Sequence, residues 1–170
     1  MTTTVSAPIT RPYDSTRVYQ DGIIAGILGA LAVALWFLIF DSARGRPFYT
    51  PSILGTALFG RGASLAPLEA TPVSMDMVLM FTWVHGLVFA ALGGIAAWLL
   101  AVAERSPHVG FGIILLFVVF EACFTMAAYL LAAPILHALT WPAVVIANLL
   151  AAAVMARYLW WRHPALRVEP

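Results

Sequence analysis

The sequence has little charge and no lysine. Charged residues make up 10% of the chain and hydrophobic residues 62%, whereas an average soluble protein is about 25% charged. So few charges cannot cover the surface of a water-soluble globule of this size. The nine basic residues are all arginine, face eight acidic residues and form no basic block, which excludes a nucleic-acid-binding surface. The composition therefore predicts a membrane protein.

The sequence also lacks the patterns that carry most enzyme chemistry. Its single cysteine, Cys123, lies in an apolar run and has no partner for an intramolecular disulfide. We find no phosphate-binding glycine loop, no metal-ligand cluster and no arrangement of nucleophile, base and orienting group. These absences favour a protein without enzymatic activity of its own.

Four uncharged or nearly uncharged stretches are long enough to cross a bilayer, which needs about 20 apolar helical residues. They run from about 22–40, 77–103, 109–133 and 140–161. Trp and Tyr residues gather near the ends of these stretches, where the headgroup region accommodates both an apolar ring and a polar edge. The predicted fold is an all-α membrane protein, an antiparallel bundle of four transmembrane helices.

The parts outside the spans set the orientation. A polar segment 1–20 and a tail 162–170 share one side, and the loop 41–76 lies on the other. Six arginines fall on the side of the termini and three on the side of the loop, so the positive-inside rule predicts cytoplasmic termini in a bacterial inner membrane. The segment 1–20 does not resemble a signal peptide, so we expect the first span to remain as an uncleaved anchor.

The loop 41–76 contains the patch PSILGTALFG at 51–60. A proline start, a serine at the second position and a glycine end predict a short helix that lies at the outer interface or caps the bundle. We interpret this loop as a cover for the bundle, and a lid over a substrate or partner is the alternative.

Small residues recur at four-residue spacing, which allows close packing of membrane helices. The sets are Gly22 and Gly26, Ala25 and Gly29, then Gly86, Ala90 and Gly94, and finally Ala143, Ala147 and Ala151. The same faces serve either the bundle itself or contacts in a homo-oligomer or with another membrane protein. Membrane lipids are the other expected partners.

Five polar residues remain at membrane depth, where such side chains are costly. They are Thr82, His85, Glu121, Thr125 and Asn148. With a rise of 1.5 Å per residue, His85 and Asn148 lie roughly 12 Å below the outer interface and Glu121 roughly 18 Å below it. Thr82 and His85 share a helical face, as do Glu121 and Thr125.

Glu121 is the most informative member, because an isolated charge is unfavourable in hydrocarbon and no Arg lies at its depth. Either a protonated Glu121 shares hydrogen bonds with Asn148 and Thr125, or Glu121 and His85 exchange one proton. The cluster either fixes helix register or handles protons or a ligand.

Metal and haem sites have weaker support. The sulfurs of Met75, Met77 and Met80, with His85 and His137, are soft ligands that suit copper, but methionine in apolar segments usually serves packing. Two histidines at one depth would suit a haem, yet His137 belongs to a turn whereas His85 is buried. We predict no cofactor.

Most of the chain resembles small bacterial integral membrane proteins with four spans and no established activity. The resemblance is carried by Asp21-Gly22, Ala25-Gly26, Val33 to Leu38, Asp41, Gly45 to Phe48, Thr50-Pro51, Phe117 to Glu121, Asn148 to Ala151, Tyr158 to Trp160 and Arg162 to Pro164. It implies a four-span fold and no activity. It also implies that the segment from Gly45 to Pro51 and Glu121 belong to the shared pattern.

We therefore expect a non-enzymatic accessory or assembly subunit of the membrane. The alternatives are a membrane redox or proton-handling subunit that uses His85 and Glu121, and a small-molecule transporter.

Overall fold

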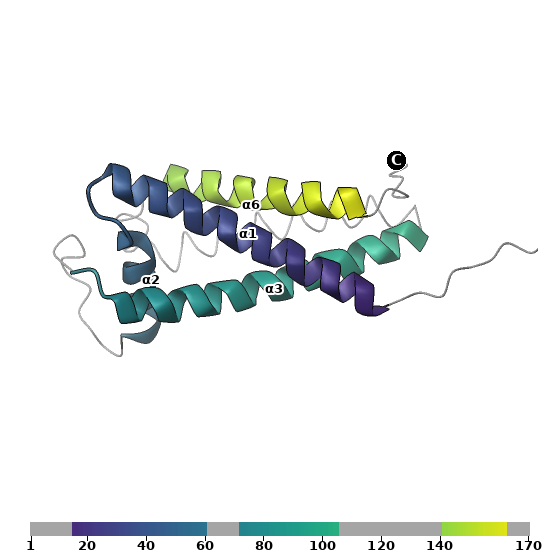
Figure 1. The fold of residues 1–170 in the computed structure, drawn as a ribbon, viewed down its shortest axis with the longest axis horizontal. Coiled ribbons are helices and arrows are strands. Elements are labelled where there is room, and N and C mark those ends of the chain that lie inside the picture. Colours follow the sequence, from purple (N-terminus) through teal and green to yellow (C-terminus); the bar gives the residue numbers. More distant parts are fainter. Residues whose placement is uncertain (1–14, 61–71, 106–140, 163–170) are drawn as a thin grey trace, which may run out of the picture.

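A computed structural model describes residues 15–60, 72–105 and 141–162, and all the secondary structure in these ranges is helical. The helices are α1 (Ser15–Ala43), α2 (Tyr49–Phe59), α3 (Met75–Arg105) and α6 (Trp141–Arg162) (Figure 1). The predicted third span, 109–133, and the tail after residue 162 lie outside the described residues.

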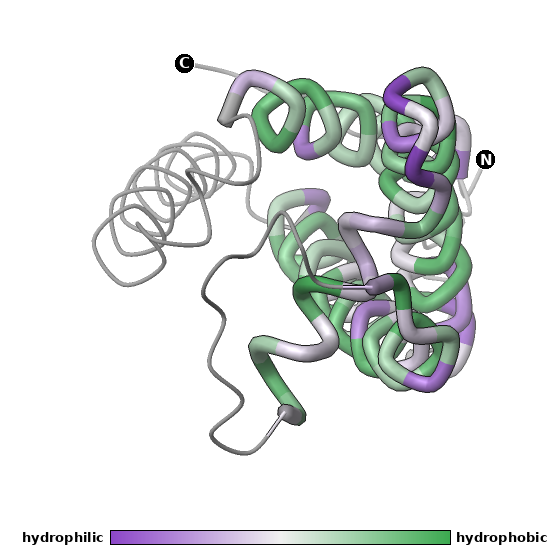
Figure 2. The backbone as a smooth tube through the Cα atoms, turned by 90° about the vertical axis from the view of Figure 1, so that its left-hand side faces the viewer, coloured by the Kyte–Doolittle hydropathy of each residue, from purple (hydrophilic) through white to green (hydrophobic). Residues whose placement is uncertain are grey.

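Three of these helices are long and apolar enough to cross a membrane: 16–43, 75–104 and 142–162. In the most apolar 18 residues of each, only 28%, 22% and 22% of the residues are buried within the protein. Most of the apolar side chains therefore face outward, and Figure 2 shows that hydrophobic residues predominate along the helices. A helix that is apolar on its outer face suits lipid and not water. The three helices support the prediction of a membrane-spanning protein.

The helices extend beyond the predicted spans because a helix does not end where the hydrocarbon ends. α1 begins at Ser15, inside the predicted polar segment 1–20, and ends at Ala43. In this added first turn Arg17 and Tyr19 are exposed, whereas Val18 is buried. The alternation of buried and exposed residues thus continues before the start of the predicted span. The predicted short helix is present as α2, which begins two residues before the expected proline start.

Helix α1 is central to the described part of the fold. It packs against α3 on one side and against α6 on another. Val18 and Ala25 of α1 share an apolar core cluster with Ala97 and Ala101 of α3 and with Leu159 of α6. The start of α1 therefore lies beside the ends of α3 and α6, and both of these helices run antiparallel to α1 (Figure 1).

Glycines bring the backbones of α1 and α3 into direct contact. A Cβ placed on Gly93 would overlap the carbonyl oxygen of Gly22 and lie 2.6 Å from the amide nitrogen of Gly26. A Cβ placed on Gly26 would overlap the carbonyl oxygen of Phe89. The crossing therefore requires glycine on both helices, as close packing in lipid commonly does.

The small residues of α3 pack on a face that agrees only in part with the predicted one. Ala90 and Gly94 of the predicted set border the crossing, because a Cβ on Gly26 or Gly22 would lie 2.9 Å or 2.7 Å from their Cα atoms, but a Cβ added to Gly86 or to Gly94 itself would have no atom within 4 Å. Gly93 makes the central contact, because glycine at neighbouring positions 93 and 94 allows two helical faces and spacing alone does not choose between them.

The face of α6 that carries the small residues packs inside the described fold, as predicted. Ala143, Ala147 and Ala151 are all buried, and α6 packs on α1. Gly29 of α1 makes room for the side chain of Met155, because a Cβ on this glycine would lie 2.7 Å from the Met155 sulfur. Whether these faces also mediate homo-oligomer contacts stays a prediction.

Replacing Gly93 with alanine tests the crossing. We expect Gly93→Ala to lower the free energy of unfolding by about 1–3 kcal/mol, because overpacking forces two backbones apart. Thermal unfolding of the purified protein in detergent should show a lower Tm. Gly86→Ala is the matched control, since its Cβ meets open space and alanine favours the helix. Equal Tm values for the two variants would contradict the described crossing.

Candidate functional site

His85 lies on α3 where this helix faces α1. Its imidazole lies between the rings of Phe81 and Phe89, with centroid distances of 5.6 Å and 4.6 Å. These residues stand one turn before and one turn after the histidine, so all three share a face of the helix. The backbone of Ala30 on α1 lies close to the imidazole. His85 therefore lies where the two helices pack against each other.

The second nitrogen of His85 is the unusual feature of this arrangement. The Nε2 atom is buried and has no hydrogen-bond partner among the described residues. A buried polar atom without a partner is costly. The aromatic neighbours fix the ring and leave one nitrogen available to a further group, so the imidazole can donate or accept one proton there.

The other described members of the predicted cluster do not bond to His85. The Thr82 hydroxyl donates to the carbonyl oxygen of Val78 in its own helix, at 2.7 Å, and the residue is exposed. Asn148 on α6 is half-buried. It lies along α6 between Ala143, which contacts Trp36, and Met155, which contacts Gly29. His85 and Asn148 are therefore at similar levels along α1.

The remaining predicted members, Glu121 and Thr125, lie outside the described residues, as do Cys123 and His137. The methionines proposed as copper ligands are at the start of α3, where Met75 and Met80 are exposed. Within 15–60, 72–105 and 141–162, no three His, Cys, Asp or Glu residues are grouped to hold a metal ion.

A second polar site, which the sequence did not reveal, joins α1 to α2. Helix α1 ends with Gly45 in the left-handed conformation, at φ 73°. The amide of Arg46 donates to the carbonyl of Asp41, and the amide of Gly45 donates to the carbonyl of Ser42. This pair of bonds is the Schellman motif, which glycine favours because it has no Cβ. The motif turns the chain back toward the bundle.

The carboxylate of Asp41 caps the N-terminus of α2, although it lies 9 residues before Thr50 in the sequence. Its Oδ2 accepts the Thr50 backbone N–H at 2.7 Å, and its Oδ1 accepts the Thr50 hydroxyl at 2.8 Å. The residue before α2 is Phe48, at φ 64°, and its side chain cannot cap the helix. Asp41 supplies the oxygen that an N-cap serine or aspartate normally gives. Asp41 is 3% exposed, and these two bonds engage both of its carboxylate oxygens.

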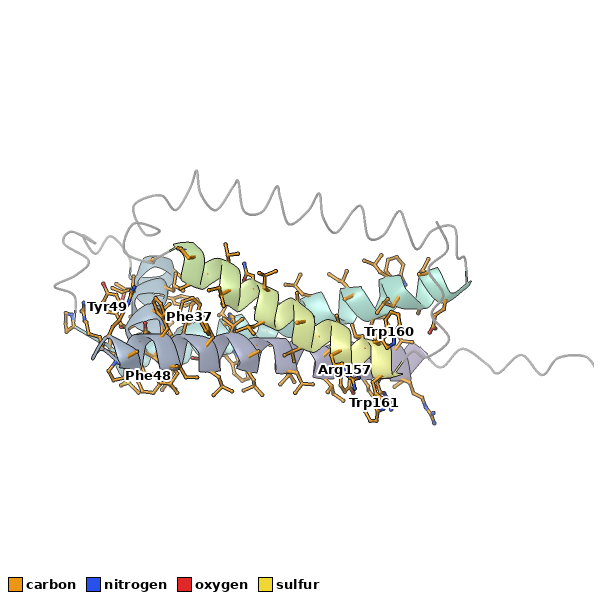
Figure 3. All side chains as sticks on the ribbon, turned by 90° about the horizontal axis from the view of Figure 1, so that it is seen from above. Phe37, Phe48, Tyr49, Arg157, Trp160 and Trp161 are labelled. Carbon is orange, nitrogen blue, oxygen red and sulfur yellow. The ribbon has the colours of Figure 1, made fainter. Side chains whose placement is uncertain are left out.

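Helix α2 is in turn tied to the start of α3. The Ser52 hydroxyl oxygen accepts the Ser74 backbone N–H at 2.9 Å, and both Ser52 and Ile53 are almost fully buried. A Cβ on Gly55 would overlap the carbonyl oxygen of Met77, so α2 rests directly on the α3 backbone. We call the segment from Asp41 to Ser52 the elbow. Figure 3 shows the labelled Phe48 and Tyr49 at this end of the bundle.

Two polar contacts tie α6 to α1 near opposite ends. The Trp36 Nε1–H donates to the carbonyl oxygen of Ala143 at 2.9 Å. At the other end, Arg162 forms an ion pair with Asp21 at 2.9 Å. Asp21 is buried and Arg162 is partly exposed. The pair fixes the end of α6 beside the start of α1.

Weak signals for these contacts are present in the sequence. Asp21 and Asp41 bound the first apolar run, and Gly45 follows Asp41 at a distance that a helix C-terminal glycine would have. No local pattern, however, pairs Asp21 with Arg162.

Comparison with protein-family models, curated proteins and solved structures found no match for this chain.

Removing the Asp41 carboxylate tests the elbow. We expect Asp41→Ala to lower the free energy of unfolding by about 1–3 kcal/mol, because it leaves the Thr50 N–H buried without an acceptor. Asp41→Asn should recover part of this loss, since its carbonyl oxygen can still accept. Thermal unfolding in detergent measures both, with Asp76→Ala, an exposed acid at the start of α3, as the control. Equal Tm values for Asp41→Ala and Asp76→Ala would contradict the role of the Asp41 carboxylate in stabilising the elbow.

Proposed function

We propose that this chain is a non-enzymatic accessory or assembly subunit of a membrane, with four crossings. The observation that carries the proposal is how the described polar side chains are used. Asp41 and Ser52 hold the elbow and α2, and Asp21 and Trp36 hold α6. These groups serve to fix helix ends.

The outward faces support the same function. Large apolar side chains are exposed on each long helix, including Ile39 on α1, Trp83 on α3 and Leu149 on α6. The helices are held together by internal contacts and are apolar on the outside, so they present long apolar faces to lipid and to the helices of a partner. This arrangement is suited to holding another membrane protein in place.

The positions of the helix ends support a further crossing between α3 and α6. α3 ends beside the start of α1, because Ala101 and Val18 share a core cluster. α6 begins near the other end of α1, because Ala143 contacts Trp36. Residues 106–140 must therefore connect opposite ends of the bundle. They contain the predicted span 109–133, and about 20 residues suffice to cross.

Cysteine labelling tests the four crossings and the orientation. In a Cys123→Ala background, we expect single cysteines at Thr16 and Ser106 to react on one side of the membrane. Cysteines at Ser42 and His137 should react on the other side. In intact bacterial cells, an impermeant thiol reagent should reach only the second pair, if the termini are cytoplasmic as the arginine distribution favours. Labelling of Ser106 and His137 from the same side would refute the fourth crossing.

Proton handling by His85 with Glu121 is the second candidate function. The buried Nε2 atom of His85, which has no partner among the described residues, favours it. A carboxyl group at comparable depth is a natural partner for such a nitrogen. In this function the imidazole would take the proton from the carboxyl group and return it.

Reconstitution separates the two functions. For an accessory subunit we expect purification from native membranes in a stoichiometric complex with another membrane protein. The chain alone in proteoliposomes should then carry no proton flux across an imposed pH gradient. We expect Glu121→Gln to leave folding and complex formation unchanged, with Glu104→Gln, an exposed acid at the end of α3, as the control. Proton flux by the isolated chain that Glu121→Gln abolishes and Glu104→Gln retains would overturn the accessory role.

A further inference from the structure

The end of α6 carries an arginine and two tryptophans on one exposed face. Arg157 precedes Trp160 and Trp161 by three and four residues, so the three side chains are neighbours on the helix surface. Trp160 and Trp161 are 64% and 67% exposed, and Arg157 is exposed as well. Figure 3 shows the three labelled residues together at this end of α6.

This face points away from the contact with α1. Near this end of α6, Leu159 is buried and Arg162 pairs with Asp21 of α1. At about 100° per residue, these two side chains lie about 100° or more around the helix from Arg157, Trp160 and Trp161. Trp161 makes an edge contact with the ring of Tyr158, at 6.4 Å between centroids, but the described fold leaves most of both tryptophan side chains exposed.

The charge of Arg157 is not balanced within the described chain. Helix α6 contains no acidic residue. The nearby carboxylate of Asp21 is engaged by Arg162 at 2.9 Å. Arg157 itself makes no hydrogen bond or ion pair with the residues that the structure describes. The described residues therefore leave the N–H donors of its guanidinium unused.

The position of Arg157 along the helix indicates the kind of group that these donors can bind. It lies five residues before the end of α6, which is roughly 7–8 Å along the axis. From there a long arginine side chain reaches the headgroup level while its stem stays in apolar surroundings. Tryptophan prefers that same level, and arginine binds phosphate through paired N–H donors.

We infer that Arg157, flanked by Trp160 and Trp161, forms a binding site for the phosphate headgroup of an anionic phospholipid. The two rings hold the upper acyl chain and glycerol region, and the guanidinium holds the phosphate. The positive charge selects lipids with a net negative headgroup over zwitterionic ones. The site requires only that α6 spans the membrane and is independent of the accessory role.

Spin-labelled lipids test the site on the full chain in bilayers. Electron paramagnetic resonance measures the relative association of phosphatidylglycerol and phosphatidylcholine with the protein. We expect the wild type to prefer phosphatidylglycerol and Arg157→Gln to reduce this preference about five-fold, the effect of one arginine near an anionic headgroup. Arg17→Gln removes the same charge from an exposed position on α1 at the same end and should reduce it clearly less.

Several results would overturn the site. Equal reductions in Arg157→Gln and Arg17→Gln would mean that the preference comes from diffuse charge. Loss of the preference on adding inorganic phosphate at constant ionic strength would mean that the site takes free phosphate. A change in oligomeric state in Arg157→Gln would mean that the face binds a second copy of the chain. Preserved helicity in Arg157→Gln by circular dichroism is required for the expected result.

Discussion

Direct backbone contact between α1 and α3 is the constraint on which the rest of the described fold depends. Lipid gives apolar helices no hydrophobic reason to associate, so close approach must supply the attraction. Gly22, Gly26 and Gly93 allow that approach because none of them has a side chain to separate the helices. Once α1 is fixed on α3, α6 packs on another side of α1, and α2 packs mainly on the start of α3.

The polar groups then divide into two kinds. Those at the helix ends, such as Asp41 and Asp21, form contacts with neighbouring helices. His85 differs, because it lies in the middle of the crossing and uses only part of its hydrogen-bonding capacity. The polar contacts thus lie mostly where helices end. Of the described polar residues within the long helices, among them Thr82 and Asn148, His85 has the buried nitrogen without a described partner, and the proposal of proton handling rests on it.

Composition and hydrophobic period were sufficient to predict long apolar helices, because a bilayer of fixed thickness imposes their length. They also predicted the short helix α2 from its proline and glycine, although the helix begins at Tyr49, two residues before Pro51. The spacing of the small residues could not show that a Cβ would be excluded at Gly93 and not at Gly94, because this depends on the angle at which the helices cross.

The elbow and the ion pair show a further limit on prediction. The bond from Thr50 to Asp41 depends on a left-handed turn at Gly45 and on Phe48 in the same region of backbone conformation. Only a folded backbone brings these groups together. Within the predicted intramembrane cluster, His85 was identified from its depth alone, and its aromatic neighbours at one-turn spacing were readable in the sequence as well.

The ion pair between Asp21 and Arg162 joins residues that are 141 positions apart. The ribosome has synthesised almost the entire described chain before Arg162 emerges, and α1 has by then already reached the translocon. This contact between the start of α1 and the end of α6 can therefore form only after the rest of the described chain has been synthesised. A chain truncated before Arg162 lacks the ion pair, so the end of α6 is no longer fixed beside the start of α1.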